Sequence, residues 1–311
     1  MAKLRMALVG LGQIARHEHL PVLAQSDVLE LVAIASPDAT HPSIPIYPTL
    51  GELLAARDDI EAVTICTPPQ GRHPIARQAI EAGCHVMLEK PPGATLSEVH
   101  DLGVAAEARG VTLFASWHTR GAPAIEPARE WLATRKVRSA RIIWREDVRR
   151  WHPGQEWLWH PGGLGVFDPG INGLSAATRI LPQPIFLEKS ELFYPSNRNA
   201  PIAARLQLRD GAGAEILADF DLRETGQQVW DVMVETDDGL LHFTGGGGGL
   251  TIAGRPVIDG AGELEGEYEA LYQHFGRLIR SSASDVDLAP LRLVADAFLL
   301  ADRKMVEPFI E

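Results

Sequence analysis

Lys90 stands at the end of a short apolar run, where a charged side chain can meet a ligand. Residues 85–92 read HVMLEKPP, and the run 86–88 is too short for a helix but typical of a strand buried on both faces of a parallel sheet. Pro91 and Pro92 lack amide donors, so the strand must end at the lysine. Ligands bind at the carboxyl edge of an open parallel sheet. Lys90 is therefore a candidate catalytic residue, and a surface lysine in a turn is the alternative.

A second candidate group lies in the segment GLGVFDPGIN, residues 163–172. Proline favours the first position of a helix, so Pro169 predicts that Asp168 is the helix N-cap and that Asn172 projects from the first turn nearby. A carboxylate near an ammonium group is a plausible base for a hydroxyl proton. Taken alone, the segment is better explained as a plain helix cap.

Residues 117–168 concentrate aromatic rings and polar groups that suit a sugar. Flat apolar rings pack on the C–H faces of a sugar, and carboxylates and imidazoles pair with its hydroxyls. A tryptophan-rich core is the alternative interpretation. The side chains concerned are Trp117, His118, Trp144, Glu146, Trp151, His152, Trp157, Trp159, His160 and Asp168.

Glu146 lies on the apolar face of a predicted strand. Residues 137–148 alternate in polarity, as expected for a strand with one buried face. Burying an unpaired carboxylate is costly, so Glu146 must have a partner or bind a ligand. The same face carries Ala140, Ile142, Trp144 and Val148.

The N-terminal residues predict a dinucleotide site. A strand over 4–9 runs into GLGQIA, residues 10–15, which matches the GxGxxA fingerprint, and a second strand over 29–35 follows at the distance that a strand–helix–strand unit requires. The first glycine permits a tight turn, the second lets a pyrophosphate approach the backbone, and the helix that follows offers free amides to the anion. The predicted contacts come from Gly10, Gly12, Gln13 and Ile14.

The sequence leaves the choice between NAD and NADP open. At the end of the second strand an acidic residue binds the adenine ribose 2'-hydroxyl, and an arginine admits a 2'-phosphate. Here the chain reads Ser36-Pro37-Asp38. A serine hydroxyl is able to hydrogen-bond a 2'-hydroxyl or a 2'-phosphate, and no arginine adjoins it.

A further loop, TPPQ at residues 67–70, leaves the third main strand at the same edge as Lys90. Thr67 and Pro68 are candidate contacts for the nicotinamide half of a dinucleotide. An ordinary diproline turn is the alternative.

The order of predicted elements defines an α/β fold class. Strands over 61–66, 84–88 and 111–116 alternate with helices over 72–82 and 95–109. This alternation predicts an N-terminal Rossmann doubly wound parallel sheet.

Beyond Arg120 the helical patterns become sparse. We therefore expect a dinucleotide-binding domain at 1–120 and a substrate-binding and oligomerisation domain at 121–311. The second domain is α+β, with an open antiparallel sheet of about six strands, a hairpin loop at 245–249, and helices over 267–280 and 287–304. Its strand runs are 137–148, 185–193, 202–209, 214–222, 228–236 and 239–244.

Composition excludes several classes of function. The chain of 311 residues carries a formal net charge of -12, which argues against nucleic-acid binding because that needs a concentrated basic face. Two cysteines without metal or redox spacing indicate a reducing, cytoplasmic setting, and no apolar run approaches a membrane span. The triplet at 17–19, HEH, lacks further ligands at suitable spacing, so we expect no metal site.

The GxGxxA turn, the EKP that ends a strand and the downstream DxGxN helix start together resemble the glucose-fructose oxidoreductase/inositol dehydrogenase (Gfo/Idh/MocA) family. The resemblance spans the whole chain. Within the family, the segments LEKPPGATL, WHPGQEWLW and GGLGVFDPGIN look most like bacterial aldose 1-dehydrogenases that oxidise L-arabinose and D-galactose.

This resemblance implies hydride transfer from C1 of a monosaccharide to NAD or NADP, which gives a lactone; D-fucose is expected as a further substrate. It implies that Lys90, Asp168 and Asn172 surround the C1 hydroxyl, with Asp168 favoured as the base and Lys90 as the orienting cation. It also implies that the open sheet forms a homo-oligomer, a dimer or tetramer, and that Glu89 and Lys90 contact the cofactor. The remaining sugar positions would be held by His118, Glu146, Trp151, His152 and Trp230.

Two alternatives stay open. One is a non-catalytic NAD(P)-binding sensor or repressor, against which the retention of both Lys90 and Asp168 argues. The other is a dehydrogenase of a cyclitol or of a phosphorylated or amino sugar; a phosphate would need a basic pocket, whereas the candidate pocket is acidic and aromatic.

Overall fold

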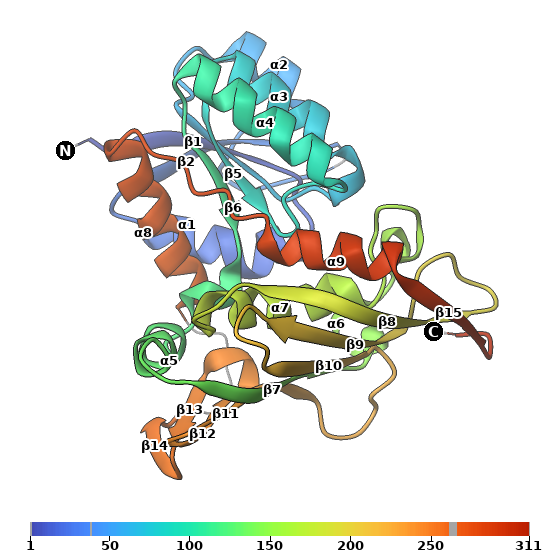
Figure 1. Ribbon diagram of the computed structural model, residues 1–311. Helices are drawn as coiled ribbons and strands as arrows, with labels where there is room; N and C mark the ends of the chain where they lie inside the picture. Colours follow the sequence, from blue (N-terminus) through green and yellow to red (C-terminus); the bar gives the residue numbers. More distant parts are fainter. Residues whose placement is uncertain (1, 38, 261–265, 311) are drawn as a thin grey trace. The chain divides into compact units, whose positions relative to one another are not determined.

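The computed structural model describes residues 2–37, 39–260 and 266–310 (Figure 1). Contacts divide the chain into two compact units: Met1–Trp117 with Tyr268–Asp287, and His118–Glu267 with Leu288–Glu311. The division predicted at residue 120 puts the whole of the helix at 267–280 in the second domain. The contacts instead group all but the first residue of this helix with the first unit.

Among the described residues, the first unit contains a six-stranded sheet in the order β3-β2-β1-β4-β5-β6, and every neighbouring pair is parallel. This confirms the predicted Rossmann sheet; the short edge strand β3 and helix α2 were not predicted. The strands are β1 (Leu4–Val9), β2 (Leu29–Ala35), β3 (Ile46–Tyr47), β4 (Ala62–Ile65), β5 (His85–Glu89) and β6 (Leu113–Ser116).

Helices cover both faces of this sheet (Figure 1). Alternate residues of β1 point to opposite faces: Ala7 and Val9 pack with α2, α3 and α4, while Met6 and Leu8 pack with α1 and α8. The helical segments are η1 (Ala15–His19), α1 (Leu20–Gln25), α2 (Leu50–Ala56), η2 (Pro69–Gly71), α3 (Arg72–Glu81), α4 (Leu96–Arg109) and α8 (Glu267–Arg280).

In the described part of the second unit, nine strands form a sheet in the order β14-β13-β12-β11-β7-β10-β9-β8-β15. The predicted antiparallel arrangement is confirmed for most pairs, but β7–β10 and β8–β15 are parallel. The strands are β7 (Val137–Arg145), β8 (Ile185–Pro195), β9 (Ala203–Asp210), β10 (Glu215–Asp221), β11 (Val229–Thr236), β12 (Gly239–Thr244), β13 (Gly249–Ile252), β14 (Arg255–Ile258) and β15 (Ala301–Val306).

Two predicted segments can be compared directly with these elements. The glycine run at 245–249 joins β12 to β13 in an antiparallel hairpin, as predicted. The helix predicted over 287–304 is wrong at its end: α9 spans Ala289–Leu299, and β15 follows. The open edge of β8 pairs with β15 along Ser190–Pro195, and this distant partner overrides the local helical pattern.

Helix α7 (Phe167–Ile180) is the central element against one face of the second sheet. It contacts β7, α9 and α5 (Ile125–Leu132), and most of its residues are buried. Close packing depends on glycine: a Cβ at Gly173 would lie 2.8 Å from Ile142 Cγ2 and 2.9 Å from Trp144 Cε3. The shorter helical segments of this unit are η3 (His118–Gly121), α6 (Val148–Trp151), η4 (Glu156–Trp159) and η5 (Gly245–Gly247).

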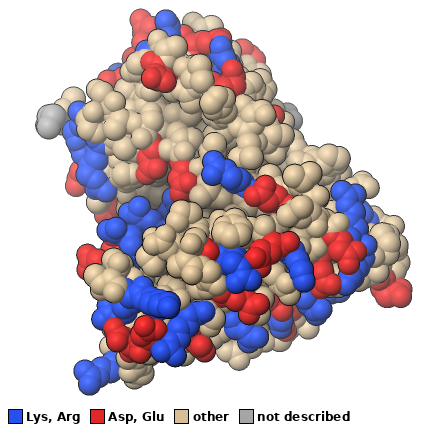
Figure 2. Space-filling model, in the orientation of Figure 1, with Lys and Arg blue, Asp and Glu red and all other residues tan. Residues whose placement is uncertain are grey.

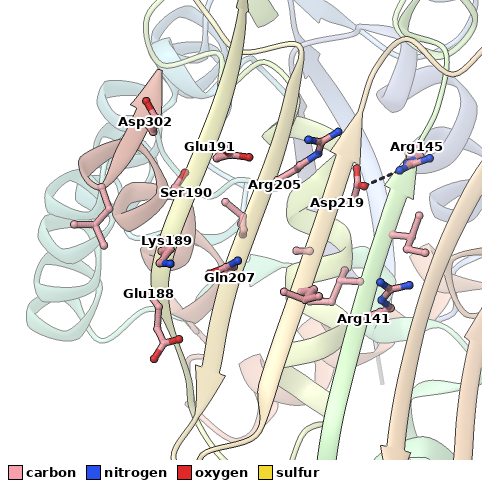
Figure 3. A pocket seen from close by; sticks show the side chains of 16 residues that line it. Arg141, Arg145, Glu188, Lys189, Ser190, Glu191, Arg205, Gln207, Asp219 and Asp302 are labelled. Carbon is pink, nitrogen blue, oxygen red and sulfur yellow. Dashed lines mark hydrogen bonds and ion pairs between the residues drawn. The ribbon is translucent and has the colours of Figure 1, made fainter. Parts of the chain in front are cut away.

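The opposite face of this sheet is charged and hollowed. A cavity of about 810 Å³ is lined by side chains from β7, β10, β9, β8 and β15 (Figure 3). Both signs of charge alternate there, as in the Arg145–Asp219 pair at 2.6 Å. Figure 2 shows the same mixing of Lys and Arg with Asp and Glu on the face that it draws.

No helix in the described residues has the length and hydropathy required to cross a bilayer.

A pair of glycine substitutions tests the packing of α7. Gly→Ala in a helix normally stabilises by about 0.5–1 kcal/mol, but overpacking a filled core costs about 1–3 kcal/mol. We therefore expect Gly173→Ala to lower the midpoint of thermal unfolding. Gly103→Ala in α4, where a Cβ would meet no described neighbour within 4 Å, should raise or preserve it. Circular dichroism measures both; a higher midpoint for Gly173→Ala would show that α7 is loosely packed.

Candidate active site

The glycine turn has the geometry that a dinucleotide requires. Gly10 has φ 89°, and a Cβ there would lie 2.9 Å from Thr67 Cγ2, so only glycine fits. A Cβ on Gly12 would meet no described atom within 4 Å beyond its immediate neighbours, so its backbone is open to a ligand. Gln13 and Ile14 are exposed in the helical turn that follows. These residues fit a pyrophosphate group, which binds exposed amides at such a turn.

Ser36 lies against this turn. The residue is 8% exposed, and its Oγ accepts the backbone N–H of Leu11 at 3.2 Å. Pro37, which follows it, is exposed, and Asp38 lies outside the described residues. These contacts, like the sequence, leave the choice between NAD and NADP open.

Lys90 follows the last residue of β5, as predicted, and is half-buried. Its backbone N–H donates to Glu89 Oε2 at 2.9 Å, and its peptide bond to Pro91 is cis. The buried Arg72 guanidinium, at the start of α3, donates to the carbonyl oxygens of Glu89, Pro91 and Thr67. One cation thus joins the loop after β4 to the loop after β5.

Glu146 is the centre of a polar cluster in the second unit. The residue is 5% exposed. Oε1 lies 3.0 Å from His152 Nε2, and Oε2 accepts Trp230 Nε1–H at 2.9 Å. Of the two predicted outcomes for this buried acid, a partner or a ligand, the structure shows partners. Trp151 packs edge-on against Trp230 with ring centroids 5.3 Å apart, which places two indole rings beside the carboxylate.

Asp168 extends the same cluster, because its Oδ2 lies 4.0 Å from His152 Nδ1. It is 3% exposed. The prediction that Asp168 is an N-cap is wrong: the cap is Val166, and Asp168 is the second residue of α7. Leu164 at φ 69° and Gly165 at φ 54° turn the chain into the helix earlier than Pro169 indicated.

Asn172 is one helical turn beyond Asp168 and is 8% exposed. Residues four apart in a helix share a face, so its amide lies on the same side of α7 as the carboxylate. The cluster therefore offers two carboxylates, an imidazole, an amide and two indole rings.

His118 has a partner that the sequence did not indicate. Its Nδ1 lies 2.6 Å from Glu267 Oε2, and both side chains are buried. Such a contact orients the imidazole ring and selects which nitrogen carries the proton.

Of the aromatic residues at 117–168, some belong to the candidate site and others to the hydrophobic core. Trp151 and Trp230 flank Glu146, whereas Trp144 packs under Gly173 and Trp159 packs against Phe309 with ring centroids 5.7 Å apart. A tryptophan-rich core is thus the better account of part of this stretch.

Sequence reasoning missed Arg72, Glu267 and His19. Their partners lie in distant elements or are backbone carbonyls, so no local pattern identifies them. The sequence places His19 only in the triplet at 17–19, for which no metal site is expected. In the described residues no group of three or more His, Cys, Asp and Glu side chains could hold a metal ion.

A parallel sheet with an open glycine turn, a lysine at a strand end, and a second unit rich in paired carboxylates define a dinucleotide-dependent oxidoreductase. Residues 4–116 match the family described as "Oxidoreductase family, NAD-binding Rossmann fold", Gfo/Idh/MocA. The chain is 44% identical over 311 residues to galactose 1-dehydrogenase of Pseudomonas fluorescens, covering 100% of both chains. The chain therefore belongs to the Gfo/Idh/MocA family of oxidoreductases.

Solved structures agree with this assignment. D-galactose-1-dehydrogenase from Rhizobium etli superimposes with a TM-score of 0.94 at 49% identity, covering 100% of this chain and 99% of that one. A 3-ketoreductase from Actinomadura kijaniata, in complex with NADP and TDP-benzene, has a TM-score of 0.84 at 18% identity. The match covers 98% of this chain and 100% of that one, and it shows the fold alone.

One substitution tests the cofactor pocket. Pro37→Arg should raise kcat/KM for NADP relative to NAD, because a guanidinium pairs bidentately with the ribose 2'-phosphate. Pro37→Ala, which removes the proline without adding charge, should leave the ratio nearly unchanged. Initial rates with each cofactor measure the ratio. If Pro37→Arg leaves the ratio of kcat/KM for NADP to that for NAD unchanged, another residue contacts the adenine ribose.

Proposed function

We propose that this protein is an NAD(P)-dependent aldose 1-dehydrogenase that oxidises D-galactose, L-arabinose and D-fucose at C1 to the aldonolactone. The observation that carries the proposal is the buried Glu146–His152–Asp168 cluster flanked by Trp151 and Trp230. It combines hydrogen-bonding groups with flat apolar walls, which is what a pyranose needs. Full-length similarity to two galactose 1-dehydrogenases supports the same substrate.

Each member of the cluster has a role in binding. The paired oxygens of Glu146 and the ring of His152 are acceptors and donors for ring hydroxyls, and Trp230 fixes one carboxylate oxygen. His118, oriented by Glu267, binds a further hydroxyl. Truncation of any of them leaves a buried polar group without its partner, so the roles are sensitive to substitution.

Oxidation at C1 removes a hydride from the carbon and a proton from its hydroxyl group. NAD or NADP, held at the glycine turn by Gly12, would supply the acceptor for the C1 hydride. Asp168 accepts the proton of the C1 hydroxyl, and Asn172 on the same helix face orients that hydroxyl. The Lys90 ammonium stabilises the oxygen as negative charge develops on it. Glu89 and Arg72 hold the backbone that presents Lys90.

Cofactor contacts are assigned to the glycine turn and to the loops beside it. Gly12 and the turn at 13–14 bind the pyrophosphate, and Ser36 binds the adenine ribose. Thr67 and Pro68, beside Gly10, border the nicotinamide half.

We also propose that the protein forms a homo-oligomer, a dimer or tetramer, through the face of the second sheet opposite α7. The mixture of charges on this face supports the proposal, since a self-complementary interface needs both signs on one patch. Arg209 with Glu188 and Lys304 with Glu191 are such pairs.

The catalytic assignment predicts that Lys90→Ala and Asp168→Ala each lower kcat by roughly a hundredfold or more, the scale of lost acid–base or electrostatic help. Cofactor affinity, measured by NADH fluorescence, should survive. Lys136→Ala and Asp58→Ala, which remove exposed charges of the same types, should retain turnover. Near-normal kcat in either site variant would show that its assigned role is wrong.

A panel of free aldoses tests the substrate. L-Arabinopyranose is D-galactopyranose without the C6 hydroxymethyl group, so discrimination between them rests on one exocyclic group and should stay within about 10 to 200-fold. D-Fucose should be accepted. D-Glucose inverts the C4 hydroxyl, loses a hydrogen-bond partner and should be much poorer.

The measurement is kcat/KM for the four sugars, with the product identified as a lactone. A preference for D-glucose or for a cyclitol would overturn the substrate while leaving the family intact.

A further inference from the structure

A set of buried polar side chains lies directly behind Lys90 in the first unit, and Glu89 is its only member with a part in the proposed reaction. His19 is 0% exposed, Tyr272 1%, and Glu89 and Tyr268 3% each. They come from three elements: η1 after the glycine turn, the last residue of β5, and α8. Polar groups this deeply buried cost free energy unless each is hydrogen-bonded, so the set must be mutually satisfied.

The Glu89 carboxylate is the centre of this set. Oε2 accepts the Lys90 backbone N–H at 2.9 Å, and Oε1 accepts the Tyr268 hydroxyl at 2.9 Å. Oε1 also lies 3.2 Å from His19 Nε2. Both oxygens are therefore engaged, and the carboxylate cannot rotate without breaking a hydrogen bond to a charged group, the stronger kind.

His19 is fixed from its other side as well. Its Nδ1 lies 2.6 Å from the Tyr272 hydroxyl, and its ring meets the Tyr268 ring at 4.8 Å between centroids. Tyr268 and Tyr272 are four residues apart on α8 and therefore share one face of that helix. The imidazole is thus clamped between α8 and the end of β5.

Electrostatics favour a charged pair here. Burial alone lowers the pKa of His19, but Cys66, Tyr272 and Glu89 outweigh it and hold that pKa well above its usual value. Burial and then the Glu89 charge raise the pKa of Tyr268, so its hydroxyl stays a donor. An imidazolium next to a buried carboxylate offsets the desolvation of both.

We propose that His19 and Tyr268 are positioning residues: they lock the Glu89 carboxylate, which in turn fixes the backbone of Lys90 relative to the glycine turn. The proposal rests on the proposed function, because it assumes that Lys90 acts on the sugar hydroxyl. Its physical basis is that a misplacement of about 1 Å in a reacting group costs on the order of a hundredfold in rate.

Two variants and one matched control test this role. Tyr268→Phe removes only the hydroxyl that binds Glu89, and His19→Gln removes the imidazole. Each should lower kcat roughly ten- to a hundredfold while KM for the sugar and the dissociation constant of NAD change less than about threefold. His17→Gln replaces an exposed histidine in the same turn of helix and should behave as the wild type.

A double variant separates positioning from loss of charge. Glu89→Gln leaves the His19 imidazolium without its counter-charge, and His19→Gln leaves the carboxylate without its cation. The double variant His19→Gln/Glu89→Gln removes both charges, so its kcat should be no lower than that of the worse single variant. Additive losses in kcat would mean that the two residues act independently and would contradict the proposal.

Hydrogen exchange gives a readout that does not depend on activity. The Lys90 amide is bonded to Glu89 Oε2, so Tyr268→Phe and His19→Gln should accelerate exchange in a peptide spanning 85–92, and His17→Gln should not. Unchanged exchange together with wild-type kcat would overturn the proposal. So would a fall in kcat that merely follows the fraction of unfolded protein.

Failure of the proposed function has a different signature. In that case wild-type enzyme would not oxidise aldoses, or Lys90→Ala would turn over normally, whereas the exchange of the Lys90 amide would still respond to Tyr268→Phe.

Discussion

A carboxylate that is removed from water must have both oxygens hydrogen-bonded, and this constraint organises each unit of the protein. In the first unit Glu89, at the end of β5, is hydrogen-bonded to the Lys90 backbone and to side chains from η1 and α8. In the second, Glu146 draws together β7, α6 and β11 through His152 and Trp230. Glu89 is the last residue of its strand and Glu146 directly follows its strand, so satisfying their oxygens also fixes the geometry of the residues around them.

The buried acids and the buried arginine are stabilised by different means. Glu89 and Glu146 are each bonded to an imidazole and to an aromatic side chain with a polar hydrogen. Arg72 instead places its guanidinium among backbone carbonyls of Thr67, Glu89 and Pro91. Arginine suits this use because its planar group presents several donors in fixed directions. The loops beside Lys90 are therefore held by side chains rather than by sheet hydrogen bonds.

Much of the fold could be predicted because its signals are local. Gly10 and Gly12, the buried strand runs and the prolines after Lys90 identified the Rossmann sheet and the strand end that carries Lys90. The end of α9 could not be predicted, because β15 forms only where β8 supplies a partner. The prediction that Asp168 is an N-cap failed for a local reason. A positive φ at Leu164 turns the chain so that α7 begins at Phe167, before Asp168. His19 meets Tyr272, which is 253 residues away, and no local pattern encodes that contact.

The chain leaves the first unit at Trp117 and returns to it at Tyr268. Until the ribosome has made α8, one face of the parallel sheet, with Met6, Leu8, Leu29 and Ile34, lacks the Tyr268, Tyr272 and Phe275 side chains that cover it. Synthesis proceeds at about 5–20 residues per second. This apolar surface therefore stays uncovered for roughly ten seconds or more while the second unit is being synthesised. The dinucleotide fold is therefore completed only after the strands of the second unit up to β14 have been translated.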